Sequence, residues 1–64
     1  MVNSIRKARR QKKLTQEKLA DKIGVTRQTI IALEKGNYTP SVMLALKISK
    51  FFKVKVEDLF KIKR

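Results

Sequence analysis

The side chains that commonly perform catalysis or bind metals are few in this sequence, and their spacing brings none of them together. The chain has no cysteine and no histidine, so thiolate chemistry and the commonest proton shuttle are absent. The five acids are scattered over predicted helix starts and faces: Glu17, Asp21, Glu34, Glu57 and Asp58. Since there is also no Gly-rich phosphate loop, we expect no catalytic site, no metal and no cofactor.

The chemistry of this chain instead lies in its basic side chains. Seventeen Lys and Arg residues stand against five acids, a formal charge of +12, which indicates attraction to a polyanion. A hydrophobic fraction of 42% favours a folded domain over a disordered basic tail. No apolar run approaches the roughly 18 residues of a membrane-spanning helix. We expect a cytoplasmic, nucleoid-associated protein with no membrane partner.

The apolar spacing predicts one all-α domain over residues 1–64, folded as a compact five-helix bundle. Basic residues around Ile5 and Ala8 predict a first helix with a narrow apolar stripe. Each of the next three helices follows a hydroxyl residue that can cap it; these residues are Thr15, Thr26 and Ser41. Gly24 and Gly36 are expected to end the second and third helices, since glycine readily adopts positive φ.

The C-terminal third is predicted to contain two more helices. The residues of the fourth helix expected to face the core are Val42, Ala45, Ile48 and Phe52. Acids in a first turn predict a short fifth helix in VKVEDLF. The final residues, FKIKR, fit either a short strand or a frayed tail.

The second and third helices, over about residues 15–35, have the spacing of a helix-turn-helix, a motif whose second helix lies in the DNA major groove. Ala20 is small where the helices must approach, and Gly24 permits a sharp turn. The residues predicted to seal the angle between the helices are Val25, Ile30 and Leu33. The recognition helix is then expected at about residues 26–35.

The chain resembles the phage repressor and Cro-like helix-turn-helix family, also called the xenobiotic response element family, in two segments, TQEKLADKIGVTRQTIIALEKG and YTPSVMLALKISKFFKVKVEDLF. The matching positions are Gln16, Leu19, Ala20, Ile23, Gly24, Val25, Ile30, Leu33, Glu34, Gly36, Pro40 and the ending Glu57, Asp58 and Leu59. The resemblance covers nearly the whole chain. It implies a five-helix domain that binds operator DNA, usually as a dimer, to regulate transcription.

The sequence departs from this family at two helix ends. Family members often have Gly or Asn after the fourth helix and Ser before the fifth, where this chain has Lys53 and Lys55. Lysine has a Cβ, which is disfavoured at positive φ, and no oxygen with which to cap a helix. We expect these two helix ends to be weaker.

Four residues of the recognition helix are expected to contact DNA bases: Arg27, Gln28, Ile31 and Ala32. If Ile30 points inward, Ile31 lies about 100° further round the helix, on the side of Arg27. Arginine can make two hydrogen bonds to guanine and glutamine two to adenine, while isoleucine and alanine can contact a thymine methyl. Alternatively, Ile31 packs against another chain or against the loop of Tyr38.

Other residues are expected to contact the phosphate backbone. Gln16 resembles the family residue that clamps a phosphate at the start of the second helix. By the same resemblance, further phosphate contacts are expected from Thr26, Thr29, Lys35, Asn37, Tyr38 and Ser41. Gln16 could instead be an ordinary surface residue, and Tyr38 could cover the edge of the core. The remaining bases, including Arg6, Lys7, Arg10, Lys12 and Lys13, are interpreted as solvated surface residues, although any one of them could instead contact a phosphate. Together they should strengthen the salt dependence of binding.

Arg9 and Glu34 are expected to form a structural ion pair. Arg9 follows Ile5 by four residues, so it should turn partly inward, and Glu34 is the only acid of the recognition helix. The resemblance implies that the two side chains form a partly buried pair. Removing one member of such a pair strands the other charge.

A dimer interface is expected on an apolar surface formed by Met43, Leu46, Phe51, Phe60 and Ile62. Met43 stands where relatives often have a polar residue. The alternative is that Phe51 and Phe60 complete the core of a single subunit.

The sequence therefore predicts a sequence-specific DNA-binding transcriptional regulator, a repressor that occupies double-stranded operator DNA as a homodimer. Two other functions stay open: an antitoxin-like module whose main partner is a protein, and a nonspecific nucleic-acid-binding protein. A large apolar surface not used in self-association would favour the first. Binding without a preferred sequence would favour the second.

Overall fold

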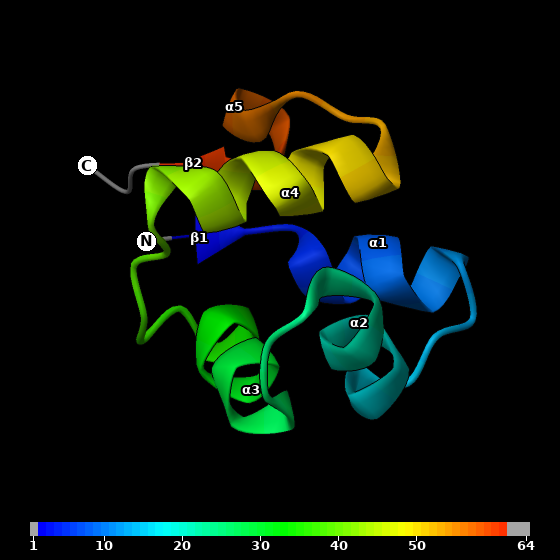
Figure 1. The fold of residues 1–64 in the computed structure, drawn as a ribbon. Helices are drawn as coiled ribbons and strands as arrows, with labels where there is room; N and C mark the ends of the chain where they lie inside the picture. Colours follow the sequence, from blue (N-terminus) through cyan, green and yellow to red (C-terminus); the bar gives the residue numbers. More distant parts are fainter. Residues whose placement is uncertain (1, 62–64) are drawn as a thin grey trace.

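Five helices and a small sheet form the fold, which a computed structural model describes over residues 2–61 (Figure 1). The helices are α1 (Ile5–Gln11), α2 (Gln16–Ile23), α3 (Arg27–Lys35), α4 (Val42–Phe52) and α5 (Val56–Leu59). The strands are β1 (Val2–Asn3) and β2 (Phe60–Lys61). In Figure 1, α4 and α5 form an upper layer and α2 and α3 a lower one, with β1 and α1 between them. The predicted all-α helix-turn-helix fold is confirmed.

The three longest helices begin at side chains that cap them. The hydroxyls of Thr15, Thr26 and Ser41 accept hydrogen bonds from the backbone N–H groups three residues later, at 3.0, 3.2 and 3.1 Å. Gly24 and Gly36 end α2 and α3 with φ of 87° and 79°. A Cβ at Gly24 would meet no atom within 4 Å, so backbone conformation, rather than lack of space, favours glycine there.

Lysines occupy two other backbone positions with positive φ. Lys13 follows α1 with φ 57°, and Lys53 ends α4 with φ 58°. Lys55 precedes α5 without a side-chain hydrogen bond to the helix. The positive φ of Lys13 and of Lys53 costs about 1–2 kcal/mol at each position, because the Cβ of the lysine approaches the backbone. The Ser49 hydroxyl donates to the Val54 carbonyl and thereby helps to hold the chain after α4.

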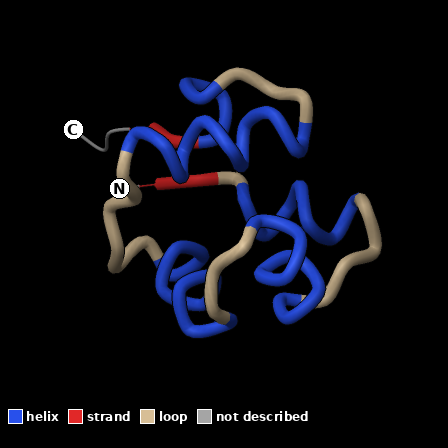
Figure 2. Tube along the Cα trace, viewed as in Figure 1, coloured by secondary structure: helices blue, strands red, loops and turns tan. Residues whose placement is uncertain are grey.

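The sheet joins the two ends of the described chain. β1 and β2 are antiparallel, with Val2 opposite Lys61 and Asn3 opposite Phe60, and Figure 2 shows the two strands side by side. The Asn3 side chain donates to the Leu33 carbonyl at 2.6 Å and accepts from the Ile5 N–H at 3.2 Å. The N-terminal strand is thereby connected both to α1 and to α3. The sequence predicted β2 only as one of two alternatives and did not predict β1.

The core contains residues from all five helices: Ile5, Leu19, Ala20, Ile23, Ile30, Leu33, Leu44, Ile48, Phe52 and Leu59. The prediction that Val42 faces this core is wrong, because its surface is 77% exposed. A helix turns by about 100° per residue, and the buried residues Leu44, Ala45, Ile48 and Phe52 place Val42 about 100° from the centre of the buried stripe. Within residues 2–61, no helix has the length and apolar composition needed to cross a membrane.

Candidate nucleic-acid interface

The outward face of α3 carries the four residues predicted to contact bases. Arg27 and Gln28 are exposed, while Ile31 and Ala32 are half-buried. On the opposite side of the same helix, Ile30 is fully buried. The adjacent isoleucines thus point in different directions, since neighbouring residues of a helix are about 100° apart.

Ile31 lines a hollow between α3 and α1. The hollow has a volume of about 330 Å³ and is lined by Arg6, Arg9, Arg10, Gln16, Ile31, Glu34 and Lys35. Tyr38 is not among these residues. Basic side chains therefore make up most of the surroundings of Ile31 in this hollow.

Arg9, Glu34 and Gln16 form a hydrogen-bonded network at the bottom of this hollow. Arg9 Nε donates to Glu34 Oε2 at 2.7 Å, and Arg9 Nη2 donates to Glu34 Oε1 at 3.2 Å. Gln16 Nε2 also donates to Glu34 Oε1, at 3.2 Å. The side chains of Arg9 and Glu34 are only 12% and 6% exposed. Glu34 therefore connects α3 to α1 and to the first turn of α2.

The third nitrogen of the Arg9 guanidinium binds the loop between α1 and α2. Arg9 Nη1 donates to the Leu14 carbonyl at 2.7 Å. With Nε and Nη2 bonded to Glu34, the guanidinium acts as a structural cross-link. Arg9 is therefore less available to a ligand than its neighbours on α1.

The first turns of α2 and α3 enclose a second hollow beside the first. Its volume is about 420 Å³, and it is lined by Arg9, Thr15, Gln16, Glu17 and Arg27. Arg9 and Gln16 also line the hollow of Ile31. The recessed surface is thus continuous from Arg27 past Gln16 to Ile31.

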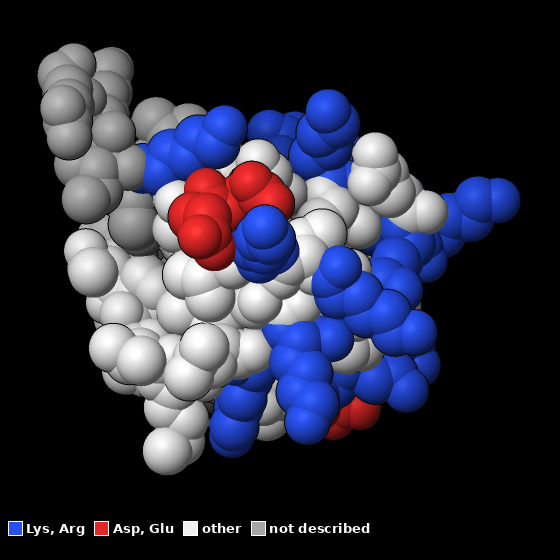
Figure 3. Space-filling view, turned by 90° about the horizontal axis from the view of Figure 1, so that it is seen from above, with Lys and Arg blue, Asp and Glu red and all other residues white. Residues whose placement is uncertain are grey.

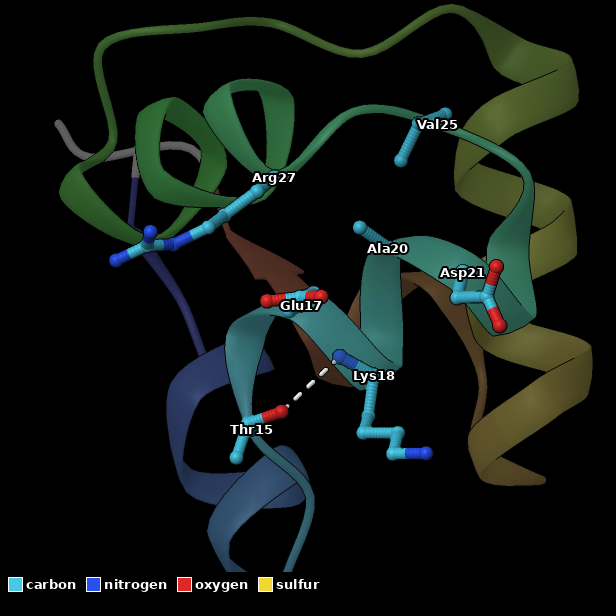
Figure 4. A pocket seen from close by; sticks show the side chains of 7 residues that line it. All are labelled: Thr15, Glu17, Lys18, Ala20, Asp21, Val25 and Arg27. Carbon is cyan, nitrogen blue, oxygen red and sulfur yellow. Dashed lines mark hydrogen bonds between the residues drawn. The ribbon is translucent and has the colours of Figure 1, made fainter.

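A different hollow, on the other side of Arg27, contains carboxylates. It is lined by Thr15, Glu17, Lys18, Ala20, Asp21, Val25 and Arg27 (Figure 4). Figure 4 shows Arg27 extending outward from the start of α3, away from Ala20 and Val25. Glu17 also lines the hollow between the first turns of α2 and α3, so carboxylates occur on both sides of Arg27.

The residues predicted to contact phosphates lie around both ends of α3. Gln16 is half-buried next to Glu34, and Lys35, Asn37 and Tyr38 are exposed. The hydroxyls of Thr26 and Thr29 lie 3.0 Å apart. The remaining member, Ser41, caps α4 and is also exposed. Tyr38 is not among the residues packed against the core.

The residues predicted for a dimer interface fall into two groups. Met43 and Leu46 are 68% and 55% exposed on α4, close to the exposed Val42. Phe51 and Phe60 are half-buried and pack against the core of the subunit. Ile62 lies outside the described residues. The exposed apolar surface of α4 therefore consists of Val42, Met43 and Leu46, and Tyr38 and Val54 are exposed elsewhere.

The structure adds two arginines to the surroundings of α3. Arg6 and Arg10 line the hollow of Ile31, whereas the sequence favoured solvated surface residues and left a phosphate contact as the alternative. Their spacing of four residues places them on one side of a helix. Only the packing of α1 against α3 shows that this side borders the recognition helix.

Basic side chains also cover a region away from α3. Seen from above, Lys and Arg gather along one side of the surface, whereas other residue types cover the opposite side (Figure 3). A hollow of about 400 Å³ between α2 and α4 is lined by Lys22, Ile23, Lys47, Lys50 and Phe51. The Lys12 Nζ lies 5.6 Å from the centre of the Phe51 ring. None of these residues lines the two hollows described above beside α1 and α3.

Comparison with known proteins assigns the family. A family model described as helix-turn-helix matches residues 5–59. The chain is 60% identical over 60 residues to an uncharacterized HTH-type transcriptional regulator of Methanocaldococcus jannaschii, and 52% identical over 60 residues to the uncharacterized HTH-type transcriptional regulator YgzD of Bacillus subtilis. Each alignment covers 94% of this chain and 91% of the relative.

A phage protein is among the more distant relatives. The chain is 37% identical over 57 residues to the cryptic phage CTXphi transcriptional repressor RstR of Vibrio cholerae, in an alignment that covers 89% of this chain and 51% of RstR. The match to the family model spans α1 to α5, including the helix-turn-helix of α2 and α3. The chain therefore belongs to the xenobiotic response element family of helix-turn-helix transcriptional regulators, a non-enzymatic class of DNA-binding proteins.

Proposed function

We propose that this protein represses transcription by occupying specific operator DNA through the major groove, as a homodimer on the nucleoid. The observation that carries the proposal is the outward face of α3, where Arg27 and Gln28 are exposed beside Ile31. Both polar side chains can form paired hydrogen bonds with base edges. The ion pair between Arg9 and Glu34 supports the rigid placement of this helix.

The base contacts are assigned to Arg27, Gln28, Ile31 and Ala32. Arg27 and Gln28 lie in the first turn of α3, which is the end of a recognition helix that commonly enters the groove. Ile31 follows one turn later and can contact a thymine methyl. The half-buried Ala32 has a small side chain, which leaves room for the wall of the DNA major groove.

The phosphate contacts are assigned to Gln16, Thr26, Thr29, Lys35, Asn37, Tyr38 and Ser41. Gln16 Nε2 has two N–H groups, and its bond to Glu34 leaves one of them for a phosphate oxygen. Lys35 and Asn37 stand at the other end of α3. Contacts at both ends would fix the register of the helix in the groove.

A second copy of the chain is the proposed occupant of the apolar surface of Val42, Met43 and Leu46. Residues 36–46 contain no charged side chain, between Lys35 and Lys47. Two subunits with a formal charge of +12 each can approach closely only where charge is absent. A symmetric pair would present two α3 helices to half-sites about one helical turn apart.

Selection of binding sites from a random duplex pool, near physiological ionic strength, tests this function. Recovery of paired, inverted half-sites supports a dimeric regulator and identifies its operator. Enrichment of a single half-site would contradict the homodimer, and no enrichment would contradict sequence-specific binding.

The exposed apolar surface also favours one alternative, an antitoxin-like module that binds a protein through Val42, Met43 and Leu46. Sedimentation of the parent chain and of the Leu46→Glu variant separates the two functions. A dimer that dissociates in the variant supports self-association. A parent chain that is monomeric at high concentration favours the protein partner.

A further inference from the structure

We propose that the DNA-binding surface extends from α3 onto α1, where Arg6 and Arg10 bind two neighbouring backbone phosphates beside the recognition helix. The inference rests on the proposed DNA-binding function and deepens it. It assigns phosphate binding to residues outside the helix-turn-helix. Arg6 and Arg10 are one helical turn apart, which places their side chains next to each other.

The position of the two arginines supports this role. Both line the hollow of Ile31, and both also line an adjoining hollow of about 670 Å³ that contains Asn3, Lys7, Gln11 and Glu34. They therefore form a ridge between two recesses along the side of α3. Both side chains are exposed, so their guanidinium groups can reach a ligand.

The local charges favour a polyanion at this ridge. Glu34 is the single acid that lines either recess, and it already accepts hydrogen bonds from Arg9 and Gln16. In the part of the chain that the structure describes, the pair of Arg9 and Glu34 is the only ion pair. Within residues 2–61, Arg6, Arg10 and the nearby Lys35 thus form no ion pair with a carboxylate.

The chemistry of the side chains points to phosphate. A guanidinium presents N–H groups in a planar fork that matches two phosphate oxygens. Arg9 is less available for such a contact, because three of its five N–H groups have protein acceptors and its side chain is only 12% exposed. Since Ile31 lines the same hollow, the phosphates at Arg6 and Arg10 would border the groove beside the base that Ile31 contacts.

A matched pair of double variants tests this assignment. Arg6→Gln with Arg10→Gln removes two charges at the ridge, and Lys47→Gln with Lys50→Gln removes two charges from α4. Affinity for one duplex is measured at several salt concentrations. We expect the arginine variant to bind about tenfold more weakly and to lower the slope of log affinity against log salt by about 1.8, because each phosphate contact contributes about 0.9. The lysine variant should change the slope by much less.

Equal changes in slope for the two double variants would overturn the inference. Melting curves of both variants check that they are folded, and Arg6→Lys with Arg10→Lys should retain the slope while losing part of the affinity. A duplex with neutral methylphosphonates beside the Ile31 base gives a second readout. The parent protein should lose affinity for that duplex, whereas the arginine double variant should bind it and the unmodified duplex equally.

The same measurements separate this inference from the proposed function. If the parent chain enriches no sequence from a random pool, sequence-specific regulation fails. The slope comparison can still be made on an arbitrary duplex, since phosphate contacts do not depend on sequence. If the parent chain selects an operator but the two double variants behave alike, only the proposed role of Arg6 and Arg10 is contradicted, and the proposed function stands.

Discussion

Two basic regions of this protein differ in their share of arginine: Lys7 and Lys35 accompany the arginines of the first region, whereas the bases of the second are lysines. The arginine face, formed by Arg6, Arg9, Arg10 and Arg27, lies along α1 and the start of α3. The lysine face, formed by Lys12, Lys22, Lys47 and Lys50, lies around Phe51 between α2 and α4. Arginine combines charge with a fixed hydrogen-bonding geometry, whereas lysine is a compact, flexible point charge. We expect the first region to recognise DNA and the second to contribute to a general positive field.

The lysines also have a local role in the helices. Lys22 and Lys50 lie in the last turns of α2 and α4, where a positive charge interacts favourably with the helix dipole. Arg6, by contrast, lies in the first turn of α1, where a positive charge is unfavourable. A stabilising role within the helix therefore explains these lysines but does not explain Arg6.

Substitution of Glu34 should have the largest effect, because Glu34 is the ion-pair partner of Arg9 in the arginine face. We expect Glu34→Ala to lower the free energy of unfolding by about 3 kcal/mol, since it strands the mostly buried charge of Arg9. The melting temperature should fall by about 10 °C or more. Asp21→Ala, which removes an exposed acid from α2, is the control. Equal melting temperatures for Glu34→Ala and the parent protein would contradict the structural role of the pair.

Substitution of Arg27 should alter specificity rather than stability. We expect Arg27→Ala to relax base preference at one position of the selected site, at a cost of about 1–3 kcal/mol for the preferred base. The measurement is the affinity for a set of duplexes that differ by single base pairs. A profile in which all duplexes weaken by the same factor would remove Arg27 from the base contacts.

Replacement of Lys53, which follows the lysine face at the end of α4, should increase stability. Lys53 has a φ of 58°, and glycine adopts this conformation without a Cβ penalty. We expect Lys53→Gly to raise the free energy of unfolding by about 0.5–1 kcal/mol, a range that allows for the greater chain entropy of glycine. Chemical denaturation checks this value, and Lys50→Gly, within α4, should instead destabilise. A less stable Lys53→Gly variant would show that the Lys53 side chain makes a contribution larger than the backbone strain.

A single charge on the lysine face should matter least. We expect Lys47→Gln to weaken binding to operator and to arbitrary DNA by the same factor, equivalent to less than about 0.5 kcal/mol, because it removes only part of a screened field. Competition between the two duplexes at low and physiological salt measures this effect. A loss of affinity for the operator alone would place Lys47 at the recognition surface. It would contradict the distinction between the arginine face and the lysine face.

Local signals in the sequence were sufficient for the helix boundaries around the recognition helix. The caps Thr15, Thr26 and Ser41 and the stop at Gly24 depend on hydrogen bonds and backbone angles within a few residues. The same local information did not identify β1, which is two residues long and pairs with residues at the other end of the chain. A strand of this length has no periodicity that a pattern can detect.

Periodicity alone was also insufficient to locate the faces of the helices. The helical spacing of Val42 with Ala45 and Ile48 was correct, yet Val42 is exposed, because spacing does not specify the centre of the buried stripe. The apolar surface of α4 therefore includes Val42 together with Met43 and Leu46. Phe51 and Phe60 contact the core, as one of the two alternatives for them anticipated.

Local sequence was enough to predict the five helices, the helix-turn-helix and the outward side of α3, because each depends on residues close together in the chain. The residues that lie beside this outward side depend instead on contacts between distant segments. Arg9 and Glu34 are 25 residues apart, and their contact was expected from family resemblance, not from spacing. The approach of Arg6 and Arg10 to Ile31 depends on how α1 packs against α3, a relation between distant segments that the core establishes.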